Sequence, residues 1–156
     1  ATISPTRDLN FTVSYTYLHP KFDKFTGGSA FNATNNIAPT DLTGRTPTGI
    51  SKHSVSVGGT YNIEVGGGNK LILHTDYQLN SAYQIAQGLP FKAAIESLNA
   101  SVSFAMENGL ELSLWGRNLT EPKYNPVIFA SVAQSGSLSG YPPPPRFYGA
   151  SAKFKF

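Results

Sequence analysis

The sequence predicts an all-β fold made of long antiparallel strands, of the kind that forms transmembrane β-barrels. Six segments of the 156-residue chain alternate apolar and polar residues with a period of two. Ser, Thr and Asn occupy 40 positions while charged residues make up only 13% of the chain, a composition that favours strands and turns over helices. The expected strands have about 9–11 residues, the length that a tilted strand needs to cross a bilayer.

The first predicted strand, Leu9 to Tyr17, shows the alternation without a break. Leu9, Phe11 and Val13 fall on one face, and Thr12 and Ser14 on the other. The remaining predicted strands cover 54–63, 71–79, 98–106, 110–117 and 147–156. Because the polar face carries mostly Ser, Thr, Asn and Gly with few charges, it suits a wet barrel lumen better than the exterior of a soluble domain.

The connections between these strands are of two kinds. Glu64 to Asn69 and Glu107 to Gly109 are tight turns that contain Gly. The segments 19–51, 81–97 and 118–146 are long, and in an antiparallel meander all three lie at the same end of the sheet. Outer-membrane barrels have this asymmetry, with short periplasmic turns and longer extracellular loops. We expect one short helix at 91–100, where the sequence reads FKAAIESLNA after Gly88 and Pro90.

Several functional classes are unsupported by the sequence. The 12 Lys and Arg residues form no run or stripe, so no nucleic-acid partner is expected. With no Cys and three scattered His, no catalytic constellation emerges, and we expect neither an enzyme nor a cofactor. His74 and Asp76 share one face of a strand, but two ligands are too few for a metal site. The GGGN segment at 66–69 precedes a strand, which indicates a hairpin turn and not a phosphate cradle.

Two segments near the end of the chain carry a family resemblance. GLELSLWGRNLTEPKY at 109–124 and PRFYGASAKFKF at 145–156 resemble the last two strands of TonB-dependent outer-membrane receptors. Residues 44–63 and 98–119 are also similar to late barrel strands of that family. The resemblance implies that 1–156 is the C-terminal part of a receptor barrel, about six strands of a roughly 22-stranded whole, with the plug and the upstream barrel absent from this chain.

The resemblance also implies a function and a set of partners. The function is active transport of a scarce bulky solute, such as a metal chelate, a sugar or another nutrient, across a Gram-negative outer membrane, with the long loops extracellular and the C-terminus periplasmic. The implied partners are outer-membrane lipid, the upstream barrel and plug segments, TonB through the plug, and the barrel assembly machinery. The alternating residues that this machinery would read are Tyr148, Ala150, Ala152, Phe154 and Phe156.

Aromatic residues in the long connections are the predicted ligand contacts, because rigid rings offer contact area at low entropic cost. They are Phe22, Phe25, Phe31, Tyr124, Phe129 and Tyr141. Packing of loop against loop is an equally good interpretation of these rings. Two other readings of the whole chain remain open: a subunit of an oligomeric outer-membrane pore or structural barrel, and a soluble β-sandwich binding domain.

Overall fold

The computed structural model describes residues 1–123 and 125–155, and within them the chain is all-β, with antiparallel pairing throughout. These residues contain no helix long and apolar enough to cross a membrane. Seven of the described strands form one sheet in the order β1-β2-β5-β6-β7-β8-β11. Their bounds are β1 Thr2–Ile3, β2 Leu9–Tyr17, β5 His53–Gly66, β6 Asn69–Gln84, β7 Lys92–Ala105, β8 Leu110–Arg117 and β11 Phe147–Phe154. The predicted all-β, antiparallel class is confirmed.

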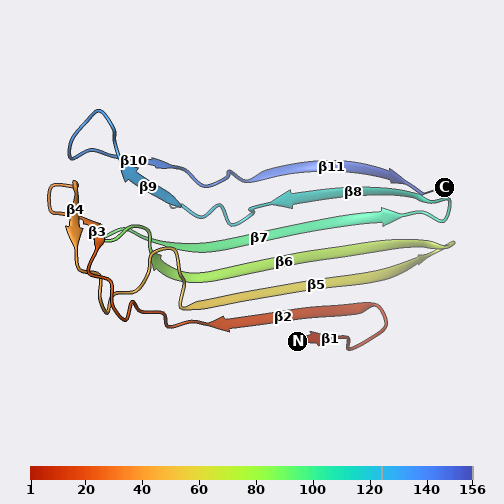
Figure 1. Ribbon diagram of the computed structural model, residues 1–156. Coiled ribbons are helices and arrows are strands. Elements are labelled where there is room, and N and C mark those ends of the chain that lie inside the picture. The colour runs from red at the N-terminus through yellow and green to blue at the C-terminus, as the bar shows by residue number, and fades with distance from the viewer. Residues whose placement is uncertain (124, 156) are drawn as a thin grey trace.

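The sheet is a meander with two unlike ends. The long strands lie side by side, with tight turns at one end, here called the turn end, and irregular connections at the other, the loop end (Figure 1). The turn between β5 and β6 contains Gly67 and Gly68 at φ 60° and 72°, and the turn between β7 and β8 contains Gly109 at φ 86°. Glycine adopts such positive φ values without steric cost, so both predicted tight turns are confirmed.

The strand register places apolar and polar residues on opposite faces of the sheet, as the alternation predicts. One cross-strand row joins Tyr61, Leu73, Val102, Leu114 and Ala150. We call the side that carries this row the apolar face. The neighbouring row lies on the polar face and consists of Thr60, His74, Ser101, Trp115 and Gly149.

The expected helix at 91–100 is wrong. Lys92–Ala105 forms β7, in which Ala93 pairs with Tyr83 of β6 and is fully buried. Pairing with β6 satisfies the backbone along this segment and overrides its weak local helix preference. Because β6 also extends to Gln84, across an irregularity between Asn80 and Tyr83, the predicted long connection 81–97 shrinks to 85–91.

The other connections contain strands that the sequence pattern did not predict. β3 (Gly28–Phe31) pairs with β4 (Ile37–Thr40), and β9 (Val127–Ala130) pairs with β10 (Leu138–Tyr141). Figure 1 shows both hairpins at the loop end. At the N-terminus, β1 adds a short strand to the edge of β2 beyond the six expected.

The buried apolar residues of the described chain lie near the loop end. They are Ala30, Leu42, Leu89 and Ala93, each at most 6% exposed. Leu42 packs so closely on Gly28 that a β-carbon there would lie 2.6 Å from the Leu42 side chain. The connections therefore pack mainly against one another, while much of the sheet's apolar face stays open.

Candidate functional site

The apolar face exposes large side chains across neighbouring strands. Leu114 is 68% exposed, Tyr148 67%, Tyr15 61% and Val102 47%. The cross-strand pairs Val102–Leu114 and Phe104–Leu112 make this surface continuous from β7 to β8. Extended apolar surfaces of this kind mark contacts with a membrane or another protein.

Tyrosines on the apolar face gather toward the loop end. The Tyr15 hydroxyl lies 2.8 Å from Nδ1 of His53, and the Tyr77 hydroxyl donates to Oε1 of Glu96 at 3.1 Å. The Tyr17 ring lies 5.1 Å from the His53 ring. Tyr15 and Tyr77 therefore each combine an apolar body with a hydrogen-bonded tip, the character of side chains at membrane interfaces.

The polar face carries a row of hydrogen-bonded side chains. Thr60 Oγ1 lies 2.9 Å from Nδ1 of His74, and Asn99 donates its side-chain amide to Oδ1 of Asp76 at 2.8 Å. Nε2 of His74 is 3.9 Å from Oδ2 of Asp76. Within residues 1–123 and 125–155, no three His, Cys, Asp or Glu side chains gather where they would hold a metal ion. The row forms a polar wall along this face of the sheet.

The predicted ligand-contact aromatics form two pairs. The rings of Phe22 and Phe25 are 4.9 Å apart, and those of Phe129 and Tyr141 are 5.7 Å apart. Phe31 lies in β3, where its backbone N–H donates to the carbonyl of Gln87. Tyr124 lies outside the described residues. Each pair lies within a single connection, Phe22 and Phe25 between β2 and β5, and Phe129 and Tyr141 between β8 and β11.

The predicted assembly signal lies in β11. Tyr148, Ala150, Ala152 and Phe154 pair with Gly116, Leu114, Leu112 and Leu110 of β8 and share the apolar face. Phe156 lies outside the described residues.

The three irregular connections are joined by side-chain hydrogen bonds. Asn35 donates its side-chain amide to the carbonyl of Gly136 at 3.2 Å, and the Ser135 hydroxyl donates to Oδ1 of Asn36 at 2.9 Å. Gln87 donates its side-chain amide to the carbonyl of Thr46 at 2.7 Å. The loop end is therefore one connected cluster, which we call the loop cluster.

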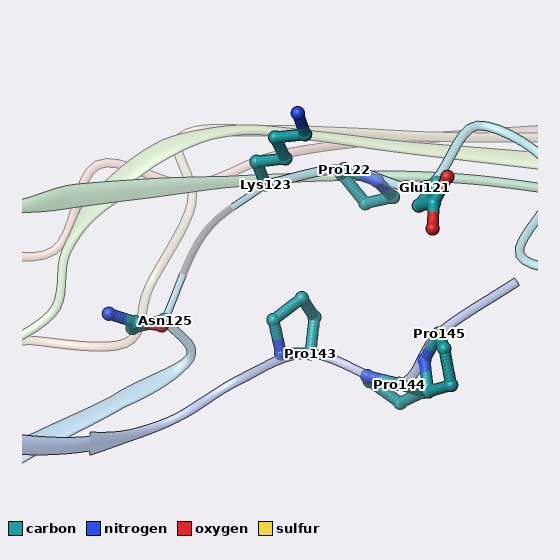
Figure 2. Close-up of a pocket in the computed structure, with 7 residues that line it drawn as sticks. All are labelled: Glu121, Pro122, Lys123, Asn125, Pro143, Pro144 and Pro145. Carbon is teal, nitrogen blue, oxygen red and sulfur yellow. The ribbon is translucent and has the colours of Figure 1, made fainter.

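A first hollow in the loop cluster, of about 430 Å³, separates the segment after β8 from the proline run before β11. Figure 2 shows Pro143, Pro144 and Pro145 opposite Pro122, with the Lys123 amine pointing away from the prolines. At the edge of this hollow, Nη2 of Arg146 lies 3.4 Å from Oε2 of Glu121. This ion pair joins the two sides and offers no free charge to a ligand.

A second hollow, of about 610 Å³, lies between residues 44–46 and 84–90. Its polar side chains include Arg45, Gln84 and Gln87, none of which the sequence pattern singled out. The only local signal is the Gly and Pro residues around them, which mark both segments as loops. Their meeting depends on the pairing of β5 with β6, which brings the two connections together.

Beside the second hollow, Asp41 has an unusual environment. Its carboxylate accepts a hydrogen bond from the backbone N–H of Thr43 at 2.9 Å. Hydrogen bonds from the Thr43 side chain and backbone lower the pKa of the Asp41 carboxyl, with a smaller contribution from the Arg45 charge. Asp41 therefore stays ionised at neutral pH.

Comparison with protein-family models, with curated proteins and with solved structures finds no match. The function must therefore be inferred from the surfaces of the molecule. Three of them bear on it: an open apolar face, a polar face of small hydrogen-bonding side chains, and a loop cluster confined to one end.

Proposed function

We propose that this chain forms part of the wall of an outer-membrane β-barrel and belongs to a TonB-dependent transporter of a scarce bulky solute. The apolar face would contact lipid, and the polar face would line the lumen. The loop cluster would lie outside the cell, where it would meet the solute. The family part of this proposal rests on the resemblance of residues 109–124 and 145–156.

The observation that carries the proposal is the open apolar face. Leu114 and Val102 are 68% and 47% exposed although both lie in the middle of paired strands. Exposing such apolar side chains to water costs free energy, whereas contact with the hydrocarbon core of a bilayer does not. In a soluble sandwich a second sheet would cover this face, but the small hairpins of this chain lie at the loop end (Figure 1).

The edges of the sheet support a larger assembly. Within the described residues, the outer edge of β2 is paired only around its centre, where β1 covers Phe11 and Thr12, and β11 is the last strand on the other side. An open edge inside a bilayer leaves backbone groups without partners, at several kcal/mol each by the usual estimate. Further strands must therefore continue the sheet, from an upstream barrel or from copies of this chain.

The test uses the absence of native cysteine, which permits clean single-cysteine labelling. Cysteines at Val102 and Leu114 report on the apolar face, and cysteines at Ser56 and Ser101 report on the polar face. Each carries a fluorophore in bilayers whose acyl chains bear a nitroxide quencher. We expect strong quenching at the first two positions and little at the others.

Equal quenching on both faces, or none at all, contradicts the barrel and favours the soluble sandwich. If the quenching supports the barrel, the mass of the intact native complex distinguishes the transporter from an oligomeric pore. A transporter gives this chain together with a larger polypeptide or as part of one, whereas a pore gives a multiple of a single subunit mass.

A further inference from the structure

The second hollow of the loop cluster has the size of a small-molecule site. Its volume of about 610 Å³ falls within the roughly 300–1,000 Å³ that is usual for ligand pockets. Gly44, Arg45 and Thr46 line one side, and Gln84, Gln87 and Leu89 line the other. Two connections far apart in the sequence therefore build it together.

Hydrogen bonds fix both sides of this hollow. Gln87 donates to the carbonyl of Thr46 at 2.7 Å, and the backbone N–H of Gly49 donates to the carbonyl of Gln84 at 3.0 Å. The side-chain amide of Gln84 donates to the carbonyls of Ala86 and Leu89. The site is therefore formed before any ligand arrives, which lowers the entropic cost of binding.

The same hydrogen bonds leave acceptors available. Gln84 and Gln87 each use the amide nitrogen on a backbone carbonyl, and in the described part of the chain neither amide oxygen has a hydrogen-bond partner. An amide oxygen held in place in this way accepts hydrogen bonds from hydroxyl groups.

Among the described residues that line this hollow, Arg45 is the one cationic side chain. Arg45 is exposed and takes part in none of the ion pairs of residues 1–123 and 125–155. The Arg45 charge helps to lower the pKa of Asp41, its acidic neighbour, but the two side chains form no ion pair in the described chain. A guanidinium group presents paired N–H donors that match a carboxylate.

We propose that this hollow binds a hydroxyl-rich solute that carries a carboxylate, such as an acidic sugar. Arg45 holds the carboxylate, and the amide oxygens of Gln84 and Gln87 accept from the hydroxyls. The guanidinium of Arg45 pairs with one planar carboxylate of such a solute. The inference rests on the proposed transport function, since it names the class of solute that the loop cluster recognises.

Calorimetric titration of the membrane-extracted protein, with any chain that copurifies, tests the site. The probe is trigalacturonate, and its methyl ester is the matched neutral probe. We expect trigalacturonate to bind and the ester to bind at least about tenfold more weakly, because charge-assisted hydrogen bonds are the stronger ones. Arg45→Gln should weaken trigalacturonate binding about 10- to 100-fold, and Arg45→Lys should weaken it less.

Arg7→Gln is the matched control, because it removes the same charge from the connection between β1 and β2 at the opposite end of the sheet. Absence of trigalacturonate binding, equal affinity for the ester, or an equal loss in Arg7→Gln overturns the proposal. Lipid quenching on the apolar face without trigalacturonate binding rejects this site alone. Binding that depends on Arg45, in a protein that shows no lipid contact, rejects the transporter and retains the site.

Discussion

Trp115 and Gly149 lie directly opposite each other on β8 and β11, and the indole occupies the space above the glycine. On the apolar face the relation is reversed, since a β-carbon on Gly116 would meet the Tyr148 ring at 3.1 Å. An aromatic ring laid over a cross-strand glycine covers the backbone that the glycine leaves bare. These two pairs pack β11 against β8 on both faces of the sheet.

Gly149→Ala should therefore destabilise the sheet, because the new methyl group and the Trp115 ring cannot share the same space. Overpacking of this kind costs about 1–3 kcal/mol in free energy of unfolding. Gly58→Ala is the control, since its β-carbon would come no closer than 3.9 Å to any neighbour, at the Thr75 carbonyl. Urea unfolding in detergent micelles measures both variants, and equal stability would refute the clamping role of Trp115.

Asp41 and Thr43 give a second prediction for single residues. Because hydrogen bonds from Thr43 lower the pKa of the Asp41 carboxyl, their stabilising effect is full above the ordinary pKa and is lost as the pH falls through the lowered value. Thr43→Val removes the side-chain hydrogen bond and should raise the Asp41 pKa toward its ordinary value. Thr43→Ser keeps a side-chain hydroxyl and should leave the Asp41 pKa low. Carboxyl titration by NMR measures the change, and an unaltered pKa in Thr43→Val would contradict this assignment.

Among the elements, the hairpins β3–β4 and β9–β10 depend on each other. Side-chain hydrogen bonds from Asn35 and Ser135 cross between the connections that contain them. In the described chain each of these hairpins is a separate two-stranded sheet, whereas β7 is paired along its length with β6 and partly with β8. Local stability should accordingly fall from the sheet to the loop cluster.

The double variant Asn35→Gly with Ser135→Ala tests this dependence. Glycine retains the positive φ of 57° at position 35 while removing the amide. We expect faster amide hydrogen exchange over residues 127–141, with β7 and β8 unchanged. Ser29→Ala, on an exposed residue of β3, is the control. Equal amide exchange in both variants would mean that the hydrogen bonds between the two connections do not stabilise residues 127–141.

For the whole molecule, the two faces of the sheet should respond oppositely to charge. Val102→Lys places a cation on the apolar face and should cost about 2–4 kcal/mol in a bilayer if that site lies near the midplane. Ser56→Lys places the same cation on an exposed position of the polar face and should cost much less. Reversible unfolding from lipid bilayers measures the difference. Equal penalties would contradict a lipid contact on the apolar face.

The sequence by itself determined the central parts of the six long strands, the tight turns and the division of residues between the two faces. Side chains alternate along any strand, so residues such as Leu73 and His74 are sorted by local geometry before any partner strand is known. The glycines at 67 and 109 likewise fix their turns locally, through the positive φ that each turn needs.

Only the tertiary structure decided which segments meet across the loop end. Residues 91–100 read locally as a helix, yet pairing with β6 draws 92–100 into β7. The hydrogen bond from Gln87 to Thr46 spans 41 positions of the chain, and the loop rings form two separate pairs, Phe22 with Phe25 and Phe129 with Tyr141. Contacts between connections depend on which strands are neighbours and on where each strand ends. That is a property of the whole sheet and leaves no periodic signal in the sequence.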